Sequence, residues 1–180
     1  MRTRVGYAGG TSVAPTYHEL GDHTEAFQLD FDPTKLTYDE LLDAFWTAHQ
    51  PERESWSRQY MAAVFCESPE QESRANQARD RIAALRNIEV RTPVIVGARF
   101  YLAEDYHQKY YLRHDAVLMR ELASYRPREL TDSTVAARLN GYVAGRGLMA
   151  RLRDELPSFG LSVTASEHLE KVVRAKQRRA

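Results

Sequence analysis

The sequence predicts an α+β fold in which a mixed sheet is covered by helices and followed by a helical C-terminal extension. Up to about residue 125, short stretches of strand-like alternation are separated by stretches with helical periodicity. Beyond that point only helical patterns follow. Strands separated by helices are typical of a sheet that buries one face under helices. We therefore expect an α+β domain over residues 1–125 and a helical extension over residues 126–180.

Composition narrows the class of protein further. The 180 residues are 43% hydrophobic, which is enough for a buried core, and 25 basic residues balance 25 acidic ones. This balance argues against a protein-wide charge for binding nucleic acid. No apolar run approaches the ~20 residues of a membrane span, and the N-terminus lacks the apolar core of a signal peptide. A single cysteine, Cys66, excludes an intrachain disulfide, so we expect a soluble protein of the reducing cytoplasm.

The first two strands flank a polar loop. Residues 3–8, "TRVGYA", predict a short strand that ends at Gly9-Gly10. Residues 25–32, "EAFQLDFD", alternate strictly and predict a strand that buries one face, made of Phe27, Leu29 and Phe31. Pro33 ends it.

Capping residues mark the start of the two helices of this domain. Thr37 and Glu40 form a capping box ahead of an apolar stripe, and Pro51 follows its end. The stripe consists of Leu41, Leu42, Phe45, Trp46 and His49. Ser68 and Pro69 open the second helix, for which we expect an inward face of Ala75, Ala78, Ile82 and Leu85.

The other elements follow from shorter patterns. Residues 60–66, "YMAAVFC", predict a strand, and residues 93–104 predict one or two more. Residues 103–123 are helical in pattern and rich in tyrosine. In the extension, helices are expected around residues 135–139 and 148–156 and from Thr164 onward, where Thr164 and Glu167 fit a capping box.

Seven short motifs occur in the order of a known family. They are "VGYAGG" (5–10), "PTY" (15–17), "HTE" (23–25), "FDP" (31–33), "LLDAFWTAH" (41–49), "RQY" (58–60) and "AEDYHQKY" (103–110). Over residues 3–112 the chain thus resembles the class A peptide methionine sulfoxide reductases. The resemblance implies a ferredoxin-like two-layer sandwich of sheet and helices.

The resemblance also implies a reaction and site residues. A cysteine thiolate would attack the sulfur of methionine-S-sulfoxide, free or in a peptide, and become a sulfenic acid that thioredoxin or a small thiol reduces. No cofactor is implied. By position in the motifs, Glu25 would be the acid that protonates the sulfoxide oxygen, and Tyr17 and Tyr60 would bind that oxygen. A carboxyl group buried near aromatic rings can hold the required proton at neutral pH.

The chain departs from the family pattern in two places. The family's nucleophile lies in a Gly-Cys-Phe-Trp-Gly motif, one strand and one helix before "VGYAGG", and these 180 residues contain no such motif. We therefore expect the domain to be N-terminally incomplete, with this strand and helix missing, apolar surface open beside Val5, Tyr7 and Phe27, and no activity. The family aspartate before "QY" is also absent, and Glu54 is the candidate to replace it in part.

Cys66 is a poor substitute for the missing nucleophile. It lies six residues beyond Tyr60 on the same predicted strand. Six residues of extended strand span about 20 Å, too far for a nucleophile to reach a sulfoxide bound at Tyr60. We therefore interpret Cys66 as a buried apolar strand residue.

Two other functions stay open at this stage. A cysteine-free paralogue would bind oxidised methionine without reducing it. An interaction protein would instead act through its C-terminal helices, with Leu148, Leu152 and Leu156 facing a partner. No metal is expected, because the spacing of the histidines fits no established ligand pattern. The basic tail, residues 171–180, is interpreted as a solvated helix end, with nucleic-acid binding as the minority alternative.

Overall fold

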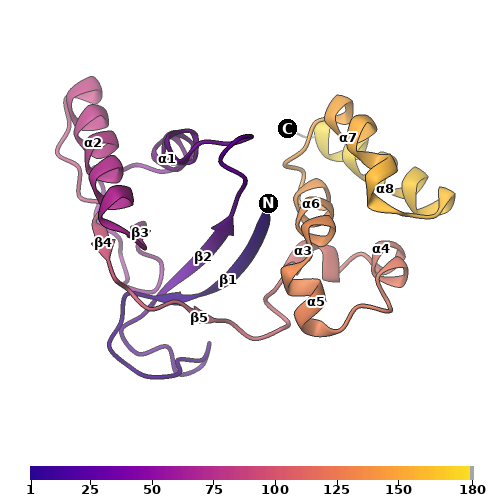
Figure 1. Ribbon diagram of the computed structural model, residues 1–180, viewed down its shortest axis with the longest axis horizontal. Helices are drawn as coiled ribbons and strands as arrows, with labels where there is room; N and C mark the ends of the chain where they lie inside the picture. The colour runs from indigo at the N-terminus through magenta and orange to yellow at the C-terminus, as the bar shows by residue number, and fades with distance from the viewer. Residues whose placement is uncertain (179–180) are drawn as a thin grey trace. The chain divides into compact units, whose positions relative to one another are not determined.

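The computed structural model describes residues 1–178, which form two compact units (Figure 1). Val5–Ala103 form the first, which we call the α+β unit. Met1–Arg4 and the residues from Glu104 onward form the second, the helical unit. The predicted α+β class is confirmed. The two units divide near residue 103. The boundary at residue 125, which was predicted for the family-like domain, stays a prediction.

Two small sheets stand where a single mixed sheet was predicted. The first has three strands in the order β2-β1-β5, with β1 at Arg2–Ala8, β2 at Thr24–Asp30 and β5 at Tyr101–Leu102. β1 and β5 are antiparallel, and Tyr7 lies opposite Tyr101. The second sheet pairs β3 (Val64–Cys66) with β4 (Val94–Val96) in parallel. The predicted strand over residues 60–66 is therefore real but shorter.

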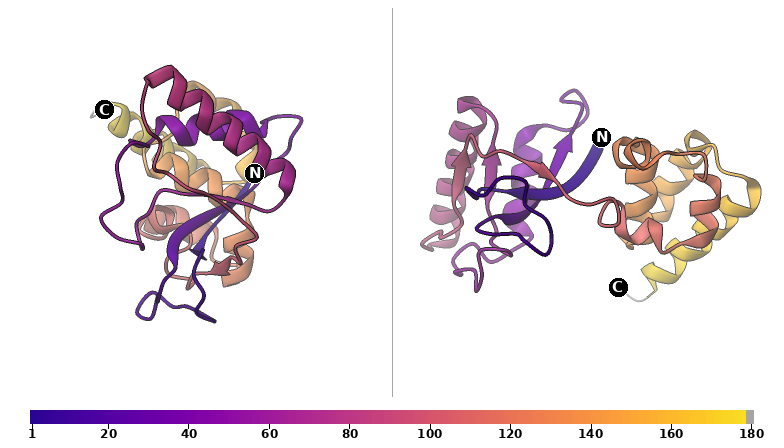
Figure 2. Two further views of the ribbon diagram at one scale, coloured as in Figure 1. Left: turned by 90° about the vertical axis from the view of Figure 1, so that its left-hand side faces the viewer. Right: turned by 90° about the horizontal axis from the view of Figure 1, so that it is seen from below.

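Helices α1 (Tyr38–Thr47) and α2 (Pro69–Arg86) pack against each other in the α+β unit (Figure 2). The predicted capping box of Thr37 and Glu40 is confirmed, as is the Ser68 cap with Pro69 in the first turn. Seven residues form the buried cluster of this unit: Leu42, Trp46, Val64, Cys66, Ala75, Ala78 and Ile82. The prediction that Leu85 points inward is wrong, because Leu85 lies on the last turn of α2, beyond this cluster, and is exposed.

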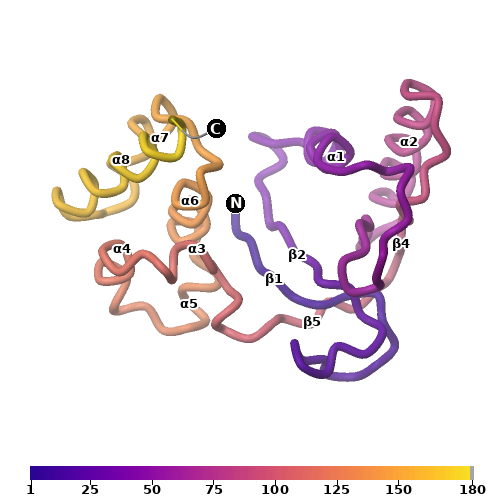
Figure 3. Tube along the Cα trace, turned by 180° about the vertical axis from the view of Figure 1, so that it is seen from behind, coloured from indigo at the N-terminus to yellow at the C-terminus, as the bar shows by residue number. Residues whose placement is uncertain are grey.

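The helical unit consists of short helices, which can be followed along the trace of Figure 3. They are α3 (Tyr110–Arg113), α4 (Ala116–Glu121), α5 (Pro127–Asp132), α6 (Thr134–Val143), α7 (Met149–Glu155), the 3-10 turn η1 (Leu156–Phe159) and α8 (Val163–Gln177). Asp115 caps α4 and so divides the stretch predicted as helical over residues 103–123. The predicted Thr164–Glu167 capping box is wrong: α8 starts earlier, with Ser162 as the cap.

These helices enclose their own core. Its fully buried members include Leu112, Leu139, Leu152 and Leu169. Leu152 is therefore not available to a partner helix, and among the three predicted partner-facing leucines only Leu148 is largely exposed. Residues 179–180, at the end of the basic tail, lie outside the described residues.

Residues 1–4 are tied into the helical unit by charged side chains. The ammonium group of Lys109 donates to the carbonyl oxygens of Thr3 and Thr131, at 2.5 and 2.8 Å. Arg4 Nε donates to Asp132 Oδ1 at 2.6 Å. Burial lowers the pKa of Lys109 to about 8. No helix among the described residues is long and apolar enough to cross a membrane.

Candidate active site

The polar loop between β1 and β2 begins at a close-packed glycine pair. Gly9 has φ +79°, and a Cβ atom there would meet a ring carbon of Phe65 at 2.7 Å. A Cβ on Gly10 would meet Asp22 Oδ1 at 2.5 Å and the His23 ring at 2.6 Å. Only glycine fits these contacts, because it lacks a Cβ and tolerates positive φ. The pair thus lets the ends of the loop come together.

His23 and Asp22 hold the loop from inside. The buried ring of His23 accepts at Nδ1 from the Gly10 amide, 3.2 Å away, and its Nε2 lies 2.8 Å from the Ser12 carbonyl oxygen. These partners fix the ring with its proton on Nε2. The Asp22 carboxylate accepts from the Thr11 amide at 2.8 and 2.9 Å and from its hydroxyl at 3.0 Å. These hydrogen bonds, chiefly the one from the Thr11 amide, lower the pKa of Asp22 to about 2.

A second loop, residues 51–60, is fastened to the first through Arg58. Its guanidinium group donates to the carbonyl oxygens of Gly9 at 2.7 Å and Asp22 at 3.1 Å. The Arg58 carbonyl oxygen in turn accepts from the Thr24 hydroxyl at 2.9 Å. The start of β2 therefore lies against the end of the second loop.

Gln59, the residue before Tyr60, holds Glu25 through two hydrogen bonds. The Glu25 amide donates to the Gln59 carbonyl oxygen at 2.9 Å. The Gln59 side-chain amide donates to Glu25 Oε1 at 2.7 Å. Among the described residues no hydrogen bond reaches Oε2, so it can face a ligand. The double contact fixes the carboxyl group beside the backbone of Tyr60.

Tyr60 and Tyr17 both present half-exposed rings. The Tyr60 side chain is 48% exposed and stacks on Trp56, with ring centroids 5.1 Å apart. Tyr17 lies on the β1–β2 loop, where its ring packs edge-on against His18 at 5.4 Å. The contacts of Gln59 place Glu25 beside the backbone of Tyr60. Tyr17 lies on the neighbouring loop, between β1 and β2.

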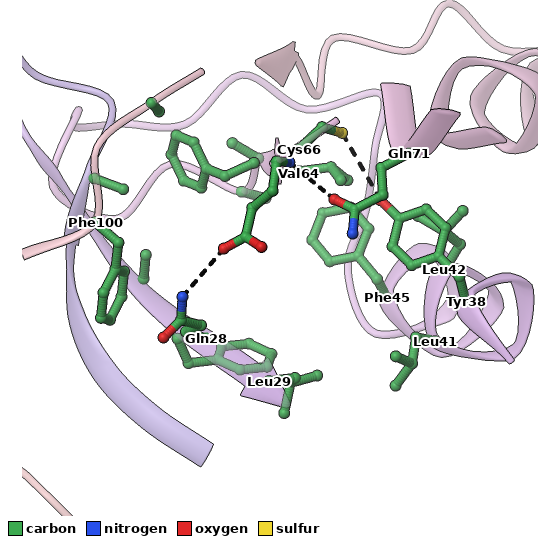
Figure 4. Close-up of a pocket in the computed structure, with 18 of the residues that line it drawn as sticks. Gln28, Leu29, Tyr38, Leu41, Leu42, Phe45, Val64, Cys66, Gln71 and Phe100 are labelled. Carbon is green, nitrogen blue, oxygen red and sulfur yellow. Dashed lines mark hydrogen bonds between the residues drawn. The ribbon is translucent and has the colours of Figure 1, made fainter. Parts of the chain in front are cut away.

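A cavity of about 350 Å³ opens beside Glu25 in the α+β unit (Figure 4). Its walls come from β2, α1, β3 and the segment before β5, and most are apolar side chains. Phe27, on its rim, is 64% exposed. The predicted burial of Phe27 is therefore wrong, whereas Leu29 and Phe31 on the same face are partly buried. The open apolar surface expected beside Phe27 is confirmed. Tyr7, also expected beside open apolar surface, is buried.

Cys66 borders the same cavity at the end of β3. In Figure 4 its sulfur points toward the hydroxyl of Tyr38, 3.8 Å away. The next residue, Glu67, accepts from Gln28 at 3.1 Å, which places the end of β3 opposite Gln28. Glu25 lies three residues back along β2, about 10 Å at the usual strand rise. Cys66 is 2% exposed, and burial raises the pKa of its thiol. A protonated, buried thiol is a weak nucleophile.

Two expectations about the acids need correction. Glu25 is exposed beside an open cavity, so the predicted burial of its carboxyl group near aromatic rings is wrong. Glu54, the candidate replacement for the family aspartate, forms an ion pair with Arg91 instead of turning toward Glu25.

The structure also adds residues that sequence reasoning missed. Gln59 and Arg58 were visible in the "RQY" motif, but no local pattern indicated that they would bind residues more than 30 positions away. The histidines have other partners: the His49 ring contacts the Phe45 carbonyl and the Thr92 hydroxyl, both at 2.9 Å. Within residues 1–178, no three His, Cys, Asp or Glu side chains gather as metal ligands would.

Comparison with known proteins gives consistent results. The sequence model of the family described as peptide methionine sulfoxide reductase matches residues 1–138. A peptide methionine sulfoxide reductase of Drosophila melanogaster is 39% identical over 170 residues, which cover 93% of this chain and 69% of that protein. Peptide methionine sulfoxide reductase A5 of Arabidopsis thaliana is 35% identical over 150 residues. The match covers 80% of this chain but only 59% of the Arabidopsis protein.

A solved structure shares the fold. The crystal structure of Mxr1 from Saccharomyces cerevisiae in reduced form superposes with a TM-score of 0.52 and 23% identity, covering 73% of this chain and 76% of that one. At this identity the superposition supports the fold alone. The family match, which extends over more than half of the residues, and the similarity to the Drosophila protein establish the relationship: the chain belongs to the peptide methionine sulfoxide reductase family.

Proposed function

We propose that the α+β unit carries the oxygen-binding half of a peptide methionine-S-sulfoxide reductase site. Glu25 donates the proton to the sulfoxide oxygen, and the hydroxyl groups of Tyr60 and Tyr17 bind that oxygen. One observation carries the proposal: Gln59, the residue before Tyr60, fixes the Glu25 carboxyl group at the edge of a largely apolar cavity. An apolar cavity with a few fixed polar groups suits a ligand with a thioether-like body and one polar oxygen.

The proposed reaction has two steps, in each of which atoms and electrons balance. A thiolate attacks the sulfoxide sulfur while Glu25 transfers a proton to the oxygen, which moves to the attacking sulfur as the methionine thioether leaves. The cysteine is oxidised to a sulfenic acid and the methionine is reduced. Two thiol groups, from thioredoxin or a small thiol, then restore the cysteine, form a disulfide and release water. The reducing cytoplasm would supply such thiols.

Glu25 must hold a proton for this step, yet its side chain is exposed in the described residues. A cysteine-bearing segment and a bound sulfoxide that fill the cavity would remove water from the carboxyl group. Desolvation favours the neutral acid. The proton donor is thus completed only when the nucleophile and the substrate are both in place.

Cys66 is not the nucleophile in this proposal. Its burial, its protonated thiol and the position of β3 opposite Gln28 all keep it from a sulfur bound at Glu25. The reductase reaction therefore requires a cysteine of the family motif, brought to the cavity beside Glu25. The 180-residue chain alone, with Cys66 as its single cysteine, should not turn over.

The test is an activity assay on the chain as given. Purified protein should reduce neither free nor peptidyl methionine-S-sulfoxide with dithiothreitol above the rate of dithiothreitol alone. A reductase of the family serves as the positive control in the same assay. Stereospecific turnover by the 180-residue chain that disappears in Cys66→Ser would contradict the assignment and make Cys66 the nucleophile.

A binding protein for oxidised methionine is the second candidate. It is favoured by the same Glu25–Gln59 contact, which persists here without a suitable thiol. Binding of methionine-S-sulfoxide to the 180-residue chain is expected for both candidates. Continued binding without turnover after the family motif is added would support the binding protein. Gain of turnover on addition of the family motif would instead support the reductase.

A further inference from the structure

Trp56 is the most unusual exposed residue near the candidate active site. Its side chain is 82% exposed, whereas Trp46, the other tryptophan, is fully buried. An indole side chain is among the largest apolar surfaces that a residue can bury, and leaving it in water forgoes that stabilisation. Nothing in the motifs assigned to the site accounts for it.

The loop that carries Trp56 is anchored on both sides of it. Before Trp56, the Arg91 amide donates to the Pro51 carbonyl oxygen at 2.8 Å, and Glu54 pairs with Arg91. After Trp56, Arg58 is fastened to the carbonyl oxygens of Gly9 and Asp22. The loop is therefore held by hydrogen bonds and an ion pair on both sides of the indole.

Its one ring partner is a residue of the candidate site. The Trp56 and Tyr60 rings lie 5.1 Å apart with planes tilted by 35°. Arg58 of this loop donates to backbone carbonyl oxygens, and the cation–π contacts found among the described residues involve Tyr101 and Tyr142. The exposed face of the indole is thus available to an apolar ligand beside the Tyr60 ring.

The distances fit a neighbouring residue of a peptide. Consecutive residues of an extended chain are ~3.3–3.6 Å apart. A side chain one or two positions from a sulfoxide bound at Tyr60 therefore reaches a ring whose centre is 5.1 Å away. Free methionine sulfoxide has no such side chain and would leave the indole in water.

We propose that Trp56 is a specificity-determining residue that binds an aromatic or large aliphatic side chain within two positions of the methionine sulfoxide. The proposal thus concerns the sequence around the methionine sulfoxide in a peptide, with apolar neighbours preferred. The inference rests on the proposed function of Glu25 and Tyr60, and it adds a contact that the reaction itself does not need.

Binding to the 180-residue chain tests this without turnover. Three ligands are compared by calorimetry: free methionine-S-sulfoxide, the capped tripeptide Gly-Met(O)-Gly and the capped tripeptide Phe-Met(O)-Phe, both as S-sulfoxides. The Phe peptide should bind about threefold to tenfold more tightly than the Gly peptide, the usual size of one added aromatic pair. Its unoxidised form should bind more weakly.

Fluorescence locates the contact. Because Trp46 is buried, acrylamide quenching of the chain reports mainly on Trp56. The Phe peptide should reduce the quenching, and the Gly peptide should change it less. Trp56→Ser should abolish the preference, so that the Phe and Gly peptides bind with equal affinity, and Trp56→Phe should keep most of the preference. Leu85→Ser, at an exposed apolar residue of α2, is the matched control and should change neither.

The outcomes separate the two proposals. Equal affinity for the Phe and Gly peptides, or an unchanged preference in Trp56→Ser, would overturn the role of Trp56 and leave the sulfoxide site intact. If no sulfoxide binds, or if all bind no better than their reduced forms, the proposed function itself fails and the Trp56 inference falls with it.

Discussion

The helical unit and the α+β unit bury their apolar surface to different extents. In the helical unit, leucines from several short helices meet in one cluster, and Leu112, Leu118, Leu139 and Leu169 are fully buried. In the α+β unit, the buried cluster lies under α1 and α2, while β2 turns Phe27 toward an open cavity. The helical unit thus has a closed core, whereas the α+β unit has an open cavity beside its core.

This difference indicates where stability and function reside. A closed core gives each buried methyl group many neighbours, so any deletion costs free energy. The cavity of the α+β unit forgoes such contacts, but it leaves Glu25 open to a ligand. Binding sites are commonly drawn from the less stable parts of a protein.

The largest expected effect compares a core deletion in each unit. Leu139→Ala should lower the free energy of unfolding of the helical unit by ~2–5 kcal/mol, because Leu139 is fully buried. Phe27→Ala should change the free energy of unfolding of the α+β unit by less than about 0.5 kcal/mol, because most of the ring is already in water. Hydrogen exchange resolved by residue measures each unit separately. Equal losses would contradict the comparison.

An apolar dye should distinguish the two units next. 8-Anilinonaphthalene-1-sulfonate should bind the native chain in the cavity beside Phe27, and Phe27→Asp should lower its fluorescence several-fold. Val163→Asp, at an equally exposed apolar residue of α8, is the matched control and should leave the fluorescence unchanged. Fluorescence that follows Val163 rather than Phe27 would place the open apolar surface in the helical unit.

The smallest effect concerns acid. The pKa of Asp22 is lowered to about 2 in the folded chain, so its carboxylate stabilises the β1–β2 loop above the ordinary aspartate range. This contribution is lost as the pH falls through about 2. Protection of the Thr11 amide from exchange should therefore decline between pH 4 and pH 2, and Asp22→Asn should remove that pH dependence. The hydrogen bond from Arg4 also lowers the pKa of Asp132 in the helical unit, so the variant, not the other unit, is the control. An unchanged decline of Thr11 protection in Asp22→Asn would contradict a local role for Asp22.

The sequence predicted the elements better than their burial. Caps such as Thr37–Glu40 and Ser68–Pro69 are local, and the structure has them as expected. Phe27 and Leu85 fit apolar stripes and are nonetheless exposed, because periodicity identifies a face without showing whether another segment covers it. The split into two small sheets likewise depends on pairing between distant strands, which no local pattern specifies.

The candidate site could be predicted only in part for the same reason. The family motifs pointed to Glu25, Tyr17 and Tyr60, and these roles remain proposals. The contact of Gln59 with Glu25 spans 34 positions, so it follows from the fold and not from spacing. Trp56 carried no signal as a site residue, because an aromatic side chain in a polar loop reads equally well as a buried anchor.

The most direct test of the central claim uses the chain joined to a Gly-Cys-Phe-Trp-Gly segment taken from a relative in the family. In this cysteine-bearing protein, Glu25→Gln should slow sulfenic acid formation from methionine-S-sulfoxide by ~10²–10⁴-fold, the usual loss for a general acid. The loss should shrink at low pH, where solvent supplies the proton. Tyr60→Phe and Tyr17→Phe should each cost less, and Cys66→Ser should cost little. An active cysteine-bearing protein in which Glu25→Gln is silent would contradict the account.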